Sequence, residues 1–227
     1  MLNRRIFLAA SSAAAANADQ PKSKLLLPSD QPDEFHLKLM WYNPVPPINQ
    51  QTWRLQIKGL VEKSQPIPLA QLRALPQQTQ SSRMKCVQCW SSRASWSGFR
   101  FQQLLDIVKP SKKAKAVRVD CADKWYEYFT IEDLLNSHVM FVLDLAGNPL
   151  PDKHGAPLRL LDPSRYGYKS AKLITALSFV EEGKGSMACD IGPYYSPDGR
   201  ILPGYDTPLD LGGKTKRKIS GGEIIDY

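Results

Sequence analysis

Proline restricts the fold of this chain more than any other residue type. The 227 residues contain 18 prolines and 14 glycines, and a proline inside a helix removes a hydrogen bond and clashes with the preceding turn. The chain is therefore expected to form strands and loops rather than a helical bundle. Hydrophobic residues make up 42% and charged residues 23%, a composition that excludes wholesale disorder and a coiled coil. No run approaches the roughly 18 apolar residues of a membrane-spanning helix.

The first 18 residues have the pattern of an export signal. Arg4 and Arg5 precede an apolar stretch that ends at Ala16, and small residues occupy the two positions that a signal peptidase reads. Paired arginines here resemble the twin-arginine class of signal, which exports proteins already folded around a cofactor. An N-terminus with two incidental arginines is the alternative. Cleavage before Asp19 would lower the net charge from +8 to +6, because two of the 30 basic residues lie in the signal.

The remaining chain divides by composition into three parts. Residues 19–40 are expected to form a polar N-terminal arm, residues 41–182 a domain, and the Gly-, Pro- and Tyr-rich residues 183–227 an irregular tail packed on that domain. Apolar periodicity predicts strands at 52–57, 82–90, 116–121, 125–130, 139–145, 157–161 and 171–180, and helices at 69–75, 99–108 and 131–137. Thr130 is a plausible N-cap of the helix at 131–137. This order of strands and helices predicts a single mixed α+β domain rich in irregular chain.

Two cysteines, Cys86 and Cys89, have the spacing of a reactive or metal-binding pair. The pair could be a thiol redox centre, half of a zinc site, or two buried small hydrophobic residues. Zinc would need a second close pair, and the other two cysteines are isolated, while a redox pair is expected at a helix start that this segment lacks. Since Arg83 and Lys85 flank Cys86, we expect the pKa of its thiol to be lowered, which favours the thiolate that binds metals or attacks substrates.

Three segments, in order along the chain, carry a family resemblance. The first runs from Pro44-Val45-Pro46 to Thr52-Trp53-Arg54-Leu55. The second runs from Met84-Lys85-Cys86-Val87 through Trp96-Ser97-Gly98-Phe99 to Leu104-Leu105. The third runs from Gly147-Asn148-Pro149 through His154 and Arg159 to Tyr166-Gly167-Tyr168-Lys169 and Lys172. Together they resemble the molybdopterin-binding domain of the sulfite oxidase superfamily. The likeness is greatest to the catalytic subunits of periplasmic methionine sulfoxide reductases, and it covers residues 41–180.

The resemblance implies that Cys86 is the thiolate ligand of molybdenum in a molybdenum–molybdopterin cofactor. Soft sulfur suits a metal that changes between Mo(VI) and Mo(IV). Cys89 matches a position without a ligand and is expected to be a packed small residue, with a second functional thiol as the alternative. Tyr126 is expected above the metal as a catalytic residue, although packing within its strand is the simpler interpretation.

His154 and Arg159 match positions where the family contacts the pterin and its phosphate. An imidazole can donate to a pterin or phosphate acceptor, and a guanidinium binds phosphate oxygens in pairs. The alternatives are that His154 is a solvated loop histidine and that Arg159 forms an ordinary surface ion pair. Residues 166–172 are expected to form a turn whose backbone amides could hold an anion. The other candidate cofactor-binding residues are Asn43, Cys121 (or a buried strand thiol), Ser170 in place of the family's glycine, Ala171 and Lys172, with Lys169 as an additional charge near the phosphate.

Three departures separate the chain from sulfite oxidases. Those enzymes have Asn-Arg-Arg soon after the metal cysteine, whereas Trp90-Ser91-Ser92-Arg93 here leaves Arg93, with Arg165, as the candidates to bind an oxyanion. The family's Arg-Asn-His before the proline loop is replaced by Met40-Trp41-Tyr42, and Asn43 could serve instead. The sulfite oxidase dimerisation domain has no counterpart after residue 180, so a monomer is expected.

These similarities imply a periplasmic molybdopterin oxidoreductase that transfers an oxygen atom and two electrons. We expect it to reduce an S- or N-oxide, with sulfite oxidation as the alternative substrate chemistry and a metal-free thiol redox or binding protein as the alternative class. Trp90 follows Cys89, so no C-x-x-C-H haem motif is present. The electron partner is therefore expected to be a separate haem or quinone-linked protein, which could be membrane-bound. Nucleic-acid binding is not expected, because only residues 214–218 form a basic run.

Overall fold

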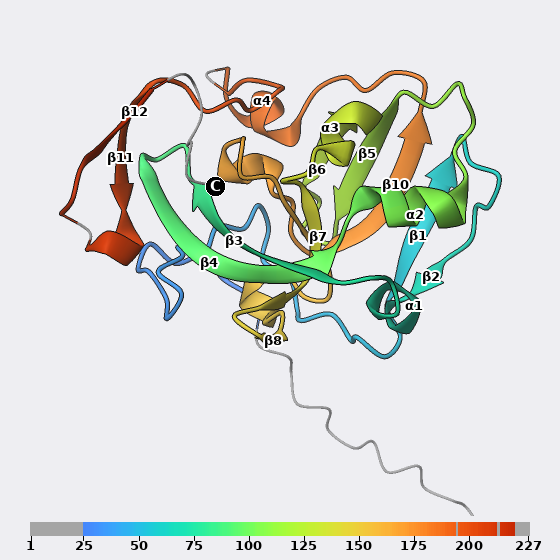
Figure 1. Cartoon of the computed structure of the whole chain (residues 1–227), viewed down its shortest axis with the longest axis horizontal. Coiled ribbons are helices and arrows are strands. Elements are labelled where there is room, and N and C mark those ends of the chain that lie inside the picture. The colour runs from blue at the N-terminus through green and yellow to red at the C-terminus, as the bar shows by residue number, and fades with distance from the viewer. Residues whose placement is uncertain (1–24, 194, 213, 221–227) are drawn as a thin grey trace, which may run out of the picture.

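The structure is a computed structural model that describes residues 25–193, 195–212 and 214–220. The predicted signal, residues 1–18, lies outside the described residues. One sheet contains five strands in the order β2 (Ile67–Pro68), β1 (Arg54–Gly59), β10 (Ile174–Val180), β5 (Ala116–Cys121) and β6 (Tyr126–Thr130). Strands β1 and β10 are parallel and the other pairs are antiparallel. This sheet lies on the right of the molecule in Figure 1.

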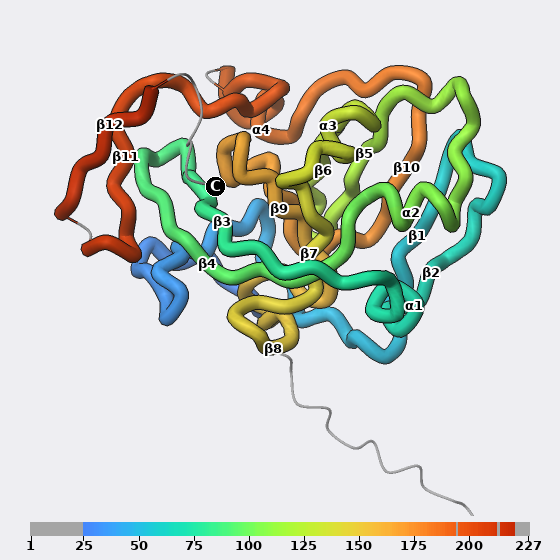
Figure 2. The backbone as a smooth tube through the Cα atoms, in the orientation of Figure 1, coloured from blue at the N-terminus to red at the C-terminus, as the bar shows by residue number. Residues whose placement is uncertain are grey.

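A second sheet is built around one long hairpin, β3 (Gln78–Lys85) and β4 (Trp90–Phe99). The far end of β4 pairs with β7 (Met140–Leu145), which also pairs with β8 (Asn148–Pro149) and β9 (Arg159–Leu161). The near end of β4 pairs with β11 (Gly204–Pro208), which pairs with β12 (Arg217–Ile219). Figure 2 shows the blue N-terminal arm and the red tail at the same end of the molecule as this hairpin.

The helices are short, as the prolines predicted. The α-helices are α1 (Leu69–Arg73), α2 (Phe101–Val108), α3 (Ile131–Leu135) and α4 (Met187–Ile191), and the 3-10 helices are η1 (Asp152–His154), η2 (Gly167–Lys169) and η3 (Leu209–Leu211). Thr130 caps α3 as expected, because its hydroxyl accepts from the amide of Asp133 at 3.0 Å while the Asp133 carboxylate accepts from the amide of Thr130 at 3.2 Å. None of the described helices is long and apolar enough to cross a membrane.

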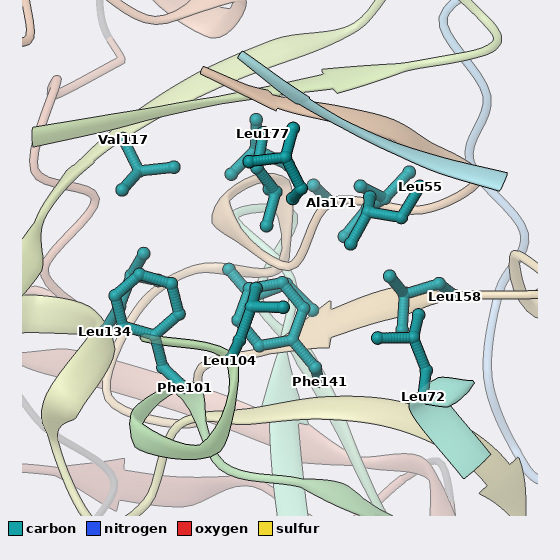
Figure 3. Close-up of a cluster of buried hydrophobic side chains, with 14 of the residues drawn as sticks. Leu55, Leu72, Phe101, Leu104, Val117, Leu134, Phe141, Leu158, Ala171 and Leu177 are labelled. Atoms are coloured by element: carbon teal, nitrogen blue, oxygen red, sulfur yellow. The ribbon is translucent and has the colours of Figure 1, made fainter. Parts of the chain in front are cut away.

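The main core lies between the two sheets. Figure 3 shows Val117 and Leu177 of the first sheet facing Phe101 and Leu104 of α2, with Phe141 of β7 beside them. Strand β7 is buried on both faces, since Phe141 and Leu143 enter this core while Met140 and Val142 enter a second one with residues of the β3–β4 hairpin. The predicted single α+β domain is thus confirmed, and β7 joins its two halves.

Each strand predicted in the domain overlaps an observed strand, but two expectations were wrong. The helix expected at 99–108 begins at Phe101, because β4 continues to Phe99 and pairs there with Phe141. The tail is packed on the domain but is not irregular throughout, since it forms α4, β11 and β12. Strand β4 contains four serines, and the five residues of β11 include a Gly, an Asp and a Pro, so their sequences lack the apolar alternation that marks a strand.

Gly98 is required where β4 and β7 approach each other. A Cβ at this position would lie 1.9 Å from the carbonyl oxygen of Phe141, and the strand register shifts between Ser97 and Gly98. We expect Gly98→Ala to lower the free energy of unfolding by about 2 kcal/mol or more, because main chain must move. Ser97→Ala, which adds no atom, is the matched control. Equal denaturation midpoints for the two variants would contradict this role of Gly98.

Candidate active site

A cavity of about 320 Å³ opens between the hairpin, the arm and the tail. Its walls come from residues 37–42 at the end of the arm and the start of the domain, from Met84, Cys86, Val87, Gln88 and Trp90 of the β3–β4 hairpin, from Asp123 and Trp125, from His154, Arg159, Gly167, Tyr168 and residues 170–172, and from Ile191 and Tyr195 of the tail. This volume lies at the lower end of the range of small-molecule sites. Six predicted site residues line the cavity, namely Cys86, His154, Arg159, Ser170, Ala171 and Lys172.

Cys86 begins the tight turn that joins β3 to β4. Its amide donates to the carbonyl of Trp90 at 2.8 Å, and the amide of Cys89 donates back to the carbonyl of Cys86 at 3.2 Å. Cys89 has a left-handed backbone, with φ of 65°. The Cys86 side chain faces the cavity, whereas Cys89 is exposed. Cys89 is therefore not the packed residue that we expected, because the turn directs it to solvent.

Burial raises the pKa of the Cys86 thiol, against the expectation from its basic neighbours. Lys85 still acts to lower this pKa, but successive side chains of a strand point to opposite faces. Met84 and Cys86 face the cavity, while Arg83 binds Asp210 and Lys85 binds Asp206. The two cations that were expected to activate the thiol are thus neutralised on the other side of β3.

Three cations, Lys38, Arg159 and Lys172, line the cavity with no carboxylate in salt-bridge contact among the described residues, although Asp123 also lines it and its charge acts to raise the pKa of Lys172. Arg159 is 2% exposed, donates to the carbonyl of His154 at 3.1 Å and lies 4.9 Å from the Trp96 ring. Burial lowers its pKa to about 10. Lys172 donates to the carbonyl of Met40 and lies 3.9 Å from the Trp41 ring. Burial, and then the charge of Arg159, lower its pKa to about 7. The uncompensated charge suits an anionic ligand.

His154 is held by the N-terminal arm. Its Nε2 atom lies 2.5 Å from the Asp33 carboxylate, which also accepts from the amides of Phe35 and Leu37. Burial, and then the Arg159 charge, lower the pKa of His154 to about 4 although Asp33 acts to raise it. The ring is therefore neutral at pH 7, with the Nε2 proton donated to Asp33. Its Nδ1 atom is then an acceptor. The N–H group that we expected to donate to the cofactor donates to Asp33 instead.

The turn before Lys172 differs from the expected anion nest. The amides of Ser170 and Ala171 donate to the carbonyls of Gly167 and Lys169 at 3.0 Å, so they are used within the turn. Lys169 does not face the cavity, because its ammonium is fully buried and 2.6 Å from the Glu127 carboxylate. Among the candidates in this turn, the charge that reaches the cavity is therefore that of Lys172.

Besides Lys169 and Arg165, four predicted site residues do not line the cavity. Asn43 lies behind its wall and donates to the carbonyl of Asp123 at 2.9 Å, and Cys121 is buried at the end of β5, where desolvation raises its pKa strongly. Tyr126 donates to Asp190 of α4 under the guanidinium of Arg118. Arg93 donates to the carbonyl of Ser81 at 3.0 Å and, three residues after the cavity residue Trp90, lies on the opposite face of β4.

The sequence did not reveal the aromatic and apolar lining of the cavity. Trp41, Trp90 and Trp125 line it, and the indole N–H groups of Trp41 and Trp90 are buried with no acceptor among the described residues. Met40, Tyr42 and Ile191 are large, more than 40% exposed, and also line the cavity. A soft sulfur, three cations without a salt bridge among the described residues, an imidazole acceptor and unused indole donors fit a phosphorylated, heteroaromatic cofactor with a metal.

Comparison with known proteins agrees with this donor set. The model of the oxidoreductase molybdopterin binding domain family matches residues 42–188. The chain belongs to this family. The molybdopterin-binding domain expected from the sequence is thus confirmed.

Curated relatives are named as methionine sulfoxide reductase subunits. The putative protein-methionine-sulfoxide reductase subunit YedZ1 of Azospira oryzae is 35% identical over 145 residues, which are 64% of this chain and 55% of that protein. The catalytic subunit MsrP of Xanthomonas axonopodis pv. citri is 30% identical over 186 residues, 74% of this chain and 58% of that protein. The chain thus spans little more than half the length of these relatives.

The sulfane dehydrogenase SoxCD of Paracoccus pantotrophus has the same fold. It superimposes with a TM-score of 0.60 at 21% identity, over 76% of this chain and 46% of the other. At this level of identity the likeness concerns the fold alone.

Removal of the buried guanidinium should have opposite effects on stability and on cofactor binding. In cofactor-free protein, Arg159→Met removes a charge that no described carboxylate neutralises, so we expect the free energy of unfolding to rise by about 1–3 kcal/mol. The same variant should retain little pterin when purified from a cofactor-producing host. Denaturant unfolding and pterin analysis measure the two effects. A variant that is destabilised yet fully loaded would contradict this role of Arg159.

His154 should make the cofactor-free protein sensitive to acid. The pKa of His154 is about 4 when folded against an ordinary value of 6.5, so the unfolded chain binds more protons between these values. Stability is therefore complete above pH 6.5 and falls as the pH drops toward 4, by up to about 3 kcal/mol. Unfolding measured from pH 7.5 to 4.5 should show a smaller loss in His154→Gln. Equal losses in both proteins would rule out His154 as the cause.

Proposed function

We propose that this protein reduces organic S- or N-oxides, as a methionine sulfoxide reductase-like molybdenum enzyme of the periplasm. The observation that carries the proposal is the apolar rim of Met40, Tyr42 and Ile191 around the cavity that contains Cys86. An oxide with carbon substituents can bury them against such a rim, at about 25 cal/mol per Å² of apolar surface. The names of the curated relatives support the same substrate class.

The positions of the arginines argue against sulfite as the substrate. A small dianion needs converging cations, but Arg93 does not line the cavity and Arg165 binds Asp133 and Asp162 at 2.6 and 3.3 Å. Arg159 and Lys172 do line the cavity, and by the family resemblance they bind the cofactor phosphate. Lys38 is the one further cation among the described lining residues, so a single lysine would be left to bind the dianion.

When bound, the molybdenum–molybdopterin cofactor supplies the two-electron oxygen-atom chemistry. The residues of this chain would hold and orient it. The Cys86 thiolate would bind the metal, Arg159 and Lys172 would neutralise the phosphate, and His154 Nδ1 would accept a hydrogen bond from the pterin. The three tryptophans would exclude water from the cavity, which strengthens these charge interactions.

Export and electron supply belong to the same proposal. The predicted twin-arginine signal supports a periplasmic location, and a folded, cofactor-loaded chain is what that route exports. Reducing equivalents would come from a separate haem or quinone-linked protein, which could be membrane-bound. The subunit names of the curated relatives support such a partner.

The test is a substrate panel assayed with protein from a molybdopterin-producing host. We expect about one molybdenum per chain, and reduction of sulfoxides or N-oxides by a reduced dye with a kcat/KM at least about tenfold above that for sulfite oxidation. Cys86→Ser should lose about a hundredfold or more in turnover while keeping its pterin, because oxygen replaces a soft ligand. Cys89→Ser is the matched control. Preferential turnover of sulfite, or full activity of Cys86→Ser, would refute the proposal.

A further inference from the structure

The two basic residues beside Cys86 are bound by carboxylates of the C-terminal tail. Arg83 donates to both oxygens of Asp210, at 2.7 and 3.1 Å. Lys85 lies 3.2 Å from an oxygen of Asp206. Asp206 and Asp210 lie beyond the residues that match the family model, which end at 188. A segment outside the matched domain therefore fixes the strand that carries the cavity cysteine.

Asp206 is the centre of this contact. Its side chain is 0% exposed, and besides Lys85 it accepts from the hydroxyl of Ser91 at 2.5 Å and from Arg217 at 3.0 Å. These three donors belong to β3, β4 and β12, so one buried carboxylate connects both strands of the hairpin to the tail. A buried carboxylate is stable only when its hydrogen bonds and charge are satisfied in this way.

The tail also binds the backbone of the turn itself. Strand β11 runs parallel to the start of β4, with Thr207 beside Trp90 and Pro208 beside Ser91. The amide of Thr207 donates to the carbonyl of Cys89 at 3.0 Å. Figure 1 shows β11 against the end of the hairpin, opposite the part of β4 that approaches β7. The turn that begins at Cys86 is thus held from its far face by both backbone and side-chain bonds.

We propose that residues 204–210 form a clamp that positions the Cys86 turn, with Asp206 and Asp210 as positioning residues. The proposal rests on the proposed role of Cys86 as the metal ligand. A hairpin end is prone to fray, whereas a metal ligand must be held to within about 0.5 Å of its productive place. The clamp satisfies that need. It also keeps the Arg83 and Lys85 cations on the face of β3 away from the Cys86 sulfur.

The test compares local opening of the turn in the purified holoenzyme and in two variants. Asp206→Asn removes the central charge, and Asp210→Asn is the milder change because Asp210 is partly exposed. Asp144→Asn is the matched control, since Asp144 binds a single arginine, Arg73, at 3.0 Å on β7. Amide hydrogen exchange is followed at Cys86, Cys89 and Thr207, together with molybdenum content and the electron paramagnetic resonance spectrum of the Mo(V) state.

We expect exchange at these three amides to become about tenfold faster or more in Asp206→Asn, less so in Asp210→Asn, and to stay unchanged in Asp144→Asn. The Mo(V) spectrum should shift in the first two variants alone. Unchanged exchange in both clamp variants would overturn the proposal, and so would faster exchange with an unaltered spectrum. If the wild-type protein holds no molybdenum, the proposed function fails instead, and the exchange data still test the clamp. Should Asp206→Asn not fold, Asp210→Asn decides between these outcomes.

Discussion

The alternation of side chains along β3 is the constraint on which the candidate site depends. In four consecutive residues it places Met84 and Cys86 in the cavity and Arg83 and Lys85 in ion pairs with the tail. A slip of one residue would exchange these faces, leaving two unpaired cations in the cavity and the thiol among carboxylates. The long register with β4, from Gln78 opposite Gly98 to Lys85 opposite Ser91, prevents such a slip. The hairpin therefore separates the chemistry of the cavity from the ion pairs that hold it.

The buried charges divide into two groups with different consequences. Lys169 and Glu127 are both fully buried and satisfy each other at 2.6 Å, with Ser186 donating to the second carboxylate oxygen. Arg159 and Lys172 have no such partner among the described residues. The first pair has nothing left to offer a ligand, because its hydrogen-bonding capacity is used within the protein. The second pair opposes folding until an anion enters the cavity. Within the net positive charge of the chain, Arg159 and Lys172 are therefore residues that we assign to ligand binding.

Short-range patterns in the sequence predicted most of the domain, and long-range contacts account for the rest. Strand β5 and the cap at Thr130 follow from local periodicity and capping chemistry, and Cys86, Arg159 and Lys172 follow from the family resemblance. Asp33 and Asp206 could not be predicted in that way. Asp33 reaches His154, and Asp206 reaches Lys85, each across 121 residues. The same limit explains the error for Cys86, since the burial that raises the pKa of its thiol is set by the fold and not by its neighbours in the sequence.

The site is consequently a product of the whole chain rather than of the matched domain. The arm supplies Asp33 and Met40, the tail supplies Ile191 and Asp206, and the domain between them supplies Cys86 and the two cations. The cavity is therefore assembled from segments that lie far apart in the sequence and meet only in the folded chain. The proposed export of a folded, cofactor-loaded chain, predicted from the paired arginines of residues 1–18, would be compatible with such a site.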